Sequence, residues 1–336
     1  MRDYGELRDH LGQHGHEGQA AWQRTARAFA AAVESGRLDL PLPGSGATRA
    51  RLAAFADLAG EDLSLARLSE GHADAVAILA ELGGPRPEPG SRWGVWAANP
   101  PGPNVTATRR DDSWLLHGTK QYCSGARICT DALVTAVADD GARLFAVATD
   151  GLVPDPSTWP ATGMAGSDTL DVGFPGIPAI PVGVPYSYTN RPGFSHGGVG
   201  VAACWYGGAR GVGRTLLHAA AKRDIGPHAL AHLGAVDLGL RAARAALGQA
   251  ADDIDADPGD LLGEGPLRAL RVRTLTETVA TDVLARTGRA LGAGPLGHDE
   301  AHSRAVADLT VYLRQHHAEG DLARLGEMVT ELGDTW

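Results

Sequence analysis

Residues 93–102 read WGVWAANPPG, residues 114–137 read WLLHGTKQYCSGARICTDALVTAV, and residues 144–150 read LFAVATD. In these stretches, short runs of Val, Leu, Trp and Thr alternate with turns made of Gly, Pro and Asp. This texture is typical of antiparallel β-structure. It continues to about residue 185, so the sequence predicts a β-domain over residues 91–190.

Helical patterns flank the β-domain on both sides. Before it, apolar residues recur at helical spacing over residues 18–35, 47–59 and 63–82. The Pro-rich segment PRPEPGS at 85–91 then separates helices from strands. After it, we predict helices over residues 198–222, 229–254, 261–291, 299–317 and 321–331. The chain is therefore expected to be an α+β protein with a short N-terminal helical domain (1–90), a central β-domain (91–190) and a C-terminal helical bundle (191–336).

Composition excludes several classes of partner. The chain has 336 residues and a net charge of −10, with no block of Lys and Arg, which argues against binding to nucleic acid or an anionic membrane. No apolar run is long enough to span a bilayer, and residues 1–18 do not resemble a signal peptide. The three cysteines, Cys123, Cys129 and Cys204, match no metal-binding spacing and suit a reducing compartment. We expect a cytoplasmic protein without a metal site.

The central stretch resembles the flavin-facing β-domain of the acyl-CoA dehydrogenase superfamily. Gly118, Lys120, Tyr122 and Ser124 match that family's pattern Gly-x-Lys-x-Trp-Ile-Thr/Ser, and residues 98–104 align with its Thr-Glu-Pro turn. The resemblance covers about residues 63–330. It implies an acyl-CoA dehydrogenase-like fold, in which an N-terminal helical region precedes a central antiparallel β-barrel and a C-terminal four-helix bundle.

The same resemblance implies a bound FAD. Tyr122 would form a wall beside the flavin ring, and Ser124, with Gly125 next to it, would offer a hydroxyl to the ring. Because residues two apart on a strand point to one face, Tyr122 and Ser124 are expected on the same side. The turn would anchor the flavin through the backbone amides of Ala98 and Asn99.

A second part of the implied FAD site lies in the helical bundle. In the family, a partner subunit supplies an Arg and a Gly-rich turn to the pyrophosphate. Arg223 and the run Arg289, Gly292 and Gly294 occupy the matching positions. Each also fits an ordinary helix end, where basic residues and glycines are common. The resemblance implies a homodimer or homotetramer, or alternatively a hetero-oligomer.

The catalytic base is open between two residues. The family's Glu-Gly pair near the C-terminus matches Glu319-Gly320 if three residues are inserted, whereas an ungapped alignment places His316 there. With Glu319 as base, the leading function is α,β-dehydrogenation of an acyl thioester. With His316 at this position, the chain instead resembles the flavin-dependent monooxygenases of the same fold. A third alternative is a non-catalytic subunit of a hetero-oligomer.

Overall fold

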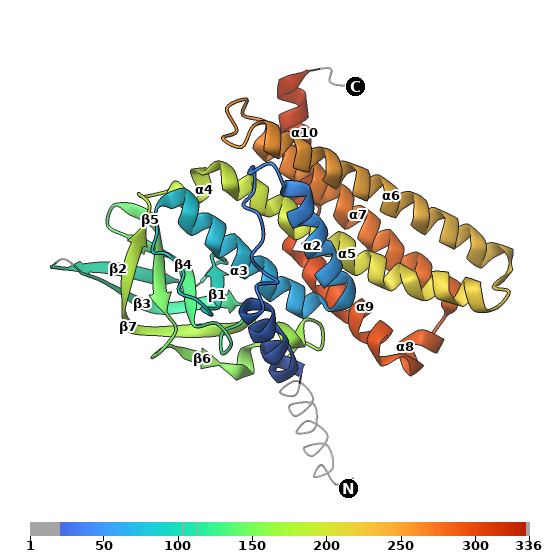
Figure 1. Cartoon of the computed structure of the whole chain (residues 1–336), viewed down its shortest axis with the longest axis horizontal. Coiled ribbons are helices and arrows are strands. Elements are labelled where there is room, and N and C mark those ends of the chain that lie inside the picture. The colour runs from blue at the N-terminus through green and yellow to red at the C-terminus, as the bar shows by residue number, and fades with distance from the viewer. Residues whose placement is uncertain (1–20, 103, 112, 334–336) are drawn as a thin grey trace, which may run out of the picture.

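A closed β-barrel and a bundle of long helices lie at opposite ends of the molecule, with one helix running between them (Figure 1). The computed structural model describes residues 21–102, 104–111 and 113–333. Its strands are β1 (Trp93–Trp96), β2 (Val105–Arg110), β3 (Ser113–Cys123), β4 (Asp131–Ala138), β5 (Gly141–Ala148), β6 (Val153–Asp155) and β7 (Leu170–Val182). Its helices are a stretch over 21–34, α2 (Thr48–Glu61), α3 (Leu63–Leu82), α4 (Ser187–Asn190), α5 (Pro192–Lys222), α6 (Gly226–Ala256), α7 (Gly265–Leu291), α8 (Gly294–His298), α9 (Glu300–Tyr312) and α10 (Glu319–Leu332).

The barrel closes through a continuous circuit of paired strands. Strand β4 pairs with β2, β2 with β3, β3 with β7, β7 with β5, and β5 again with β4. The strands β1 and β6 attach to β4 and β7. Large apolar side chains fill the interior, including Trp96, Leu116, Val134, Phe145, Val172 and Phe174. The expected small barrel is therefore present.

The expectation of purely antiparallel pairing is wrong at one edge of β4. Both β1 and β2 run parallel to β4, and they follow each other along that edge, with Trp96 opposite Val134 and Thr106 opposite Val137. Val134 and Val137 are three residues apart on β4, whereas their partners Trp96 and Thr106 are ten residues apart. The additional residues form a turn between β1 and β2. We call this segment, of which the structure describes residues 97–102 and 104, the barrel turn.

The helical bundle confirms the predicted order of these helices but shifts several of their ends, two of them by five residues or more. Helix α5 begins at Pro192 rather than residue 198, because proline is well tolerated in the first turn. The helix predicted over 299–317 ends at Tyr312 and passes into a short 3-10 turn, Leu313–Gln315. The chain then breaks at Ala318, whose φ of 48° is left-handed, before α10 begins. Residues 18–20 of the first predicted helix lie outside the described part of the chain.

Helix α3 joins the two halves. Asp62 caps its first turn by accepting a hydrogen bond from the backbone N–H of Leu65. On the barrel side, His72 Nδ1 accepts from Trp93 N at 3.2 Å, so this buried imidazole fastens α3 to β1. On the bundle side, Leu63 and Leu68 join the core that α5, α6, α7 and α9 share. The barrel and the bundle are thus held on one common helix.

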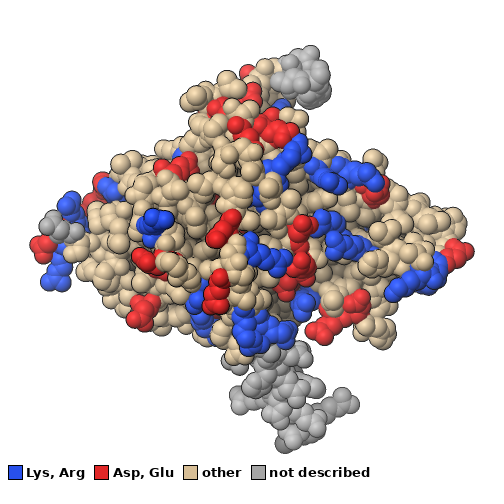
Figure 2. Space-filling view, in the orientation of Figure 1, with Lys and Arg blue, Asp and Glu red and all other residues tan. Residues whose placement is uncertain are grey.

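Acidic and basic side chains are interspersed on the face shown in Figure 2, without a large area of one sign. Among the described residues, no helix combines the length and apolarity needed to cross a membrane.

Candidate active site

A large cavity lies between the barrel, helix α3 and the bundle, with a volume of about 1300 Å³. The barrel contributes the barrel turn, the end of β3, Thr135 within β4 and the start of β5. Helix α3 contributes Arg67, Glu70 and Asp74. The bundle contributes the first turns of α5 and α7 together with part of the 311–324 stretch, namely Val311, Tyr312, Arg314, Gln315, His317, Asp321 and Arg324. Of the predicted site residues, Ala98, Asn99, Tyr122 and Ser124 line this cavity.

The Tyr122–Gly125 segment forms a corner of the cavity rather than a regular strand. Strand β3 ends at Cys123, and Tyr122 has a left-handed φ of 59°. Tyr122 and Ser124 therefore do not share one face of a regular strand, as the sequence predicted, although both line the cavity. Gly125 is required at the corner, because its φ is +72° and a Cβ would lie 2.7 Å from Cys129 Sγ.

The Ser124 hydroxyl belongs to a relay of three hydroxyl groups. Ser167 Oγ donates to Met164 O at 2.7 Å, and a carbonyl oxygen can only accept. Ser167 must then accept from Thr169 Oγ1 at 2.7 Å, and Thr169 must accept from Ser124 Oγ at 3.0 Å. With its proton used in this way, Ser124 offers the cavity an acceptor, whereas the resemblance to the family suggested a donor.

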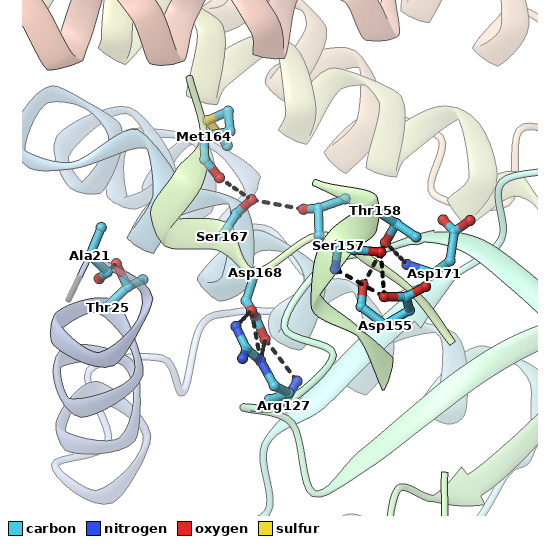
Figure 3. A network of polar contacts seen from close by, with 11 residues as sticks. Ala21, Thr25, Arg127, Asp155, Ser157, Thr158, Met164, Ser167, Asp168 and Asp171 are labelled. Atoms are coloured by element: carbon cyan, nitrogen blue, oxygen red, sulfur yellow. Dashed lines mark hydrogen bonds and ion pairs between the residues drawn. The ribbon is translucent and has the colours of Figure 1, made fainter. Parts of the chain in front are cut away.

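An ion pair beneath the relay holds it in place (Figure 3). The Asp168 carboxylate accepts from Arg127 Nε at 3.1 Å and from Arg127 N at 2.9 Å. Two backbone bonds, from Gly125 N to Ser167 O and from Ala126 N to Asp168 O, tie the Ser124 corner to the same segment. The Asp168 side chain is only 1% exposed. The pair thus fixes two neighbouring stretches of the cavity wall against each other.

A second buried carboxylate, Asp308 on α9, joins residues 164–169, which carry part of the relay, to the bundle. It accepts a hydrogen bond from Met164 N at 2.5 Å. Burial raises the pKa of Asp308 to about 6, although the bond from Met164 opposes the shift. The hydrogen bond between Met164 and α9 therefore depends on a carboxylate whose ionised form is destabilised by burial.

This raised pKa predicts a pH-dependent stability. Between the ordinary pKa of 3.8 and about 6, the folded protein binds more protons at Asp308 than the unfolded chain does. Its contribution to stability is present at low pH and is lost as the pH rises through this window. Asp308→Asn keeps an oxygen for Met164 N and removes the charge. We expect it to raise the free energy of unfolding by about 1–3 kcal/mol at pH 7.

Urea unfolding at pH 4 and pH 7 measures this effect. The gain from Asp308→Asn should shrink or vanish at pH 4, where the native carboxyl is itself protonated. An equal change in unfolding free energy at both pH values would contradict the assignment.

Charged side chains line the side of the cavity formed by helix α3 and the residue before α5. We call this side, formed by Arg67, Glu70, Asp74 and Arg191, the cavity floor. Arg67 Nη1 donates to Glu70 Oε2 at 2.6 Å, and these side chains are 15% and 5% exposed. Burial raises the pKa of Glu70 to about 7, while the Arg67 guanidinium favours its ionised form. Farther along the floor, Arg191 donates to Glu81 Oε2 at 2.7 Å and lies 3.9 Å from Asp74. The floor holds acids and bases in pairs.

The two candidate bases lie outside the cavity wall. Glu319 is exposed at the first position of α10. His316 is buried and both its ring nitrogens are engaged: Nδ1 accepts from Ala318 N at 3.1 Å, and Nε2 lies 3.0 Å from Thr274 Oγ1. Burial also lowers the pKa of His316. In this arrangement, neither residue presents a free basic atom to the cavity.

The remaining predicted site residues lie far along the bundle. Arg223 follows the last residue of α5, and Arg289, Gly292 and Gly294 surround the end of α7. The cavity contacts only the opposite, N-terminal portions of these helices. The structure therefore does not bring these residues to the cavity of the same chain. Their role at a partner's site stays a prediction.

Several residues around the cavity were not predicted from the sequence. Thr169, Ser167 and Asp168 fall in a stretch that aligned with the family but showed no catalytic pattern. Arg67, Glu70 and Asp74 interrupt the apolar face of α3. Charged residues on an otherwise apolar helix face were the sequence feature from which they could have been predicted. The indole of Trp159 lines the cavity, and its Nε1 donor has no hydrogen-bond partner among the described residues.

Comparison with known proteins gives a match in structure only. No known protein family matches the sequence, and no curated protein does. The structure of TdsC from Paenibacillus sp. A11-2, solved with FMN and indole, matches with a TM-score of 0.75 and 19% identity over 93% of this chain and 96% of that one. The same protein is also described as a dibenzothiophene monooxygenase.

Two further structures extend the comparison. KijD3, solved with FMN and a dTDP-linked amino sugar, matches with a TM-score of 0.76 and 19% identity, covering 97% of this chain and 93% of that chain. The methanesulfinate monooxygenase MsuC from Pseudomonas fluorescens matches with a TM-score of 0.70 and 18% identity, over 94% and 97%. These likenesses establish the fold, which is acyl-CoA dehydrogenase-like as the sequence predicted.

Proposed function

We propose that this protein is a flavin-dependent monooxygenase that binds FMN in the cavity between barrel and bundle. The location of Glu319 carries the proposal. Dehydrogenation of an acyl thioester needs a carboxylate at the reacting carbon, and the residue expected to supply it is exposed outside the cavity. The structural neighbours that bind FMN or are called monooxygenases favour the same alternative.

The residues of the barrel wall fit a flavin. Trp159 Nε1 is a buried donor without a described partner, and Ser124 Oγ is an acceptor in the hydroxyl relay. The pyrimidine edge of a flavin carries both acceptors and donors, so it could bond to each. The cavity also exceeds the roughly 300–1,000 Å³ usual for one small ligand, which leaves room for a substrate beside the cofactor.

The chain's own part in the reaction would be binding and exclusion of water. A bound reduced flavin would supply the electrons that activate molecular oxygen. Trp159 and Ser124 would orient the ring from the barrel side. Across the cavity, apolar and aromatic side chains would contact an uncharged part of the substrate and keep water out, among them Phe194, Val201, Leu270, Val311 and Tyr312.

One spectroscopic experiment tests the proposal. The purified protein is mixed with FMN without oxygen, then given in turn butyryl-CoA, NADH with a separate flavin reductase, and finally oxygen. We expect the flavin to stay yellow with butyryl-CoA, to bleach only with NADH and the reductase, and to reoxidise when oxygen is added. With indole as substrate and ¹⁸O₂ as oxidant, one labelled oxygen atom should appear in the product and one in water.

Other outcomes separate the alternatives. Bleaching by butyryl-CoA alone, lost in Glu319→Gln, would replace the proposal by dehydrogenation. A protein that binds neither FMN nor FAD would favour the non-catalytic subunit. The shared site at Arg223 and Arg289 predicts a dimer or tetramer, and light scattering of a flavin-loaded monomer would contradict that part alone.

A further inference from the structure

Lys120 is a lysine in an unusual environment. It is 1% exposed, in the wall between the barrel interior and the cavity. Lysine is almost never so deeply buried without a carboxylate partner. Among the residues that the structure describes, no Asp or Glu forms an ion pair with Lys120, and burial lowers its pKa to about 8. The hydrogen bonds that the described residues offer the ammonium group all come from neutral oxygen atoms.

The contacts of Lys120 follow from the gap between β1 and β2. Lys120 lies two residues beyond Gly118, where the pairing of β3 with β2 ends. Its Nζ reaches into the gap and donates to Thr135 O at 3.0 Å and Thr135 Oγ1 at 2.8 Å. From the other side it contacts Asn99 Oδ1 at 2.8 Å and Asn104 Oδ1 at 3.2 Å. The ammonium therefore fastens the barrel turn onto β4.

The charge of Lys120 stands directly behind the cavity surface. Asn99 and Thr135, which contact its Nζ, both line the cavity. Arg143 lines the same end, but it is already paired with Asp140. A cation surrounded by neutral dipoles attracts an anion that binds on their cavity side, because no carboxylate of the described residues is paired with it to cancel its field.

We propose that Asn99 and Thr135, with Lys120 behind them, form a subsite for an anionic group of the phosphate type. This inference deepens the proposed flavin function, on which the choice of probes rests. The group could come from FMN itself or from the substrate, and the probes distinguish these sources. A unit charge one side chain away, at an effective dielectric of about 20, changes affinity by roughly tenfold to hundredfold.

The decisive variant is Asn99→Asp. Its carboxylate can accept from Lys120 Nζ and from Asn104 Nδ2 as the amide does, so the barrel turn keeps its contacts. The substitution adds the missing counter-charge and also replaces the amide NH2 with an acceptor oxygen, and both changes disfavour an anion on the cavity side. Lys120→Gln removes the charge instead, and Lys120→Arg keeps it; circular dichroism and the melting temperature show whether each variant folds. Asn99→Asp keeps the test open if Lys120→Gln does not fold.

Fluorescence titration with FMN and with riboflavin, which lacks the phosphate, is the first measurement. We expect Asn99→Asp and Lys120→Gln to weaken FMN binding about tenfold or more and leave riboflavin binding unchanged. This result assigns the subsite to the flavin phosphate. Sodium pyrophosphate is the second probe, added to the riboflavin-loaded protein. Stabilisation of the wild type by pyrophosphate, lost in Asn99→Asp while both flavins bind as before, assigns the subsite to the substrate's anion.

Two results would overturn the subsite. Equal weakening of FMN and riboflavin by Lys120→Gln, with no effect of Asn99→Asp, would show that Lys120 only holds the barrel turn. Unchanged binding of all three probes in both variants would remove it altogether. The flavin proposal fails separately: if the wild type binds no flavin, yet pyrophosphate stabilises the wild type and not Asn99→Asp, the subsite remains.

Discussion

Replacing Asp168 with Ala is expected to lower the free energy of unfolding by about 3–5 kcal/mol and to abolish tight flavin binding. The carboxylate is 1% exposed and accepts several bonds from Arg127. Removing one member of a buried ion pair costs this much, because the other charge is left without its partner. Urea unfolding monitored by circular dichroism measures the stability, and fluorescence titration with FMN measures the binding.

Two matched variants separate the causes. Asp168 has a left-handed φ of 48°, which glycine adopts freely and alanine does not. Asp168→Gly therefore removes the ion pair without backbone strain, and it should still show most of the loss in unfolding free energy that is expected for Asp168→Ala. Asp168→Asn keeps the shape and an acceptor for Arg127, so a smaller loss is expected. If Asp168→Gly were as stable as the wild type, the strain rather than the ion pair would account for the alanine result.

The fold was largely predictable because its signals are local. Most strands between residues 93 and 182 are short, apolar and bounded by Gly, Pro or Asp, and the helices have regular apolar spacing. The parallel pairing of β1 and β2 with β4 was not predictable, since it depends on two strands sharing one edge. The helix break after Tyr312 was missed because residues 313–317 continue a helical pattern, and Ala318 carries no sign of its left-handed backbone.

Of the site residues, only those at the cavity corner formed by Tyr122–Gly125 and in the barrel turn were predictable from the sequence. Ser124, Tyr122 and the barrel turn reach the cavity because they flank strand ends. The sequence did not show that Ser124 would act as an acceptor, since this follows from Thr169 and Ser167, more than forty residues away. Likewise, the motif contained Lys120, but its lack of a counter-charge depends on which side chains surround it. Long-range partners decide the chemistry of these groups, and sequence spacing does not encode them.

Replacing Arg67 with Met is expected to give the other large effect, and one that depends strongly on pH. The substitution leaves Glu70, 5% exposed, without the guanidinium 2.6 Å away. At pH 8 we expect a loss of about 3–5 kcal/mol in the free energy of unfolding. Burial already raises the pKa of Glu70 from 4.5 to about 7, and losing Arg67 raises it further. The folded variant then binds a proton that the unfolded chain releases, so its stability falls as the pH rises above about 4.5.

The double variant Arg67→Met/Glu70→Gln makes the test specific. With both charges gone, only neutral groups remain at this point of the cavity floor, and much of the lost stability should return at pH 8. Glu70→Gln alone leaves Arg67 buried and unpaired, so it should be destabilised at every pH and lack the recovery in acid. If the double variant were as unstable as Arg67→Met, the loss would come from packing of the Arg67 stem rather than from the charge of Glu70. Measuring all four proteins at pH 5 and pH 8 therefore separates the electrostatic cost of the cavity floor from its packing.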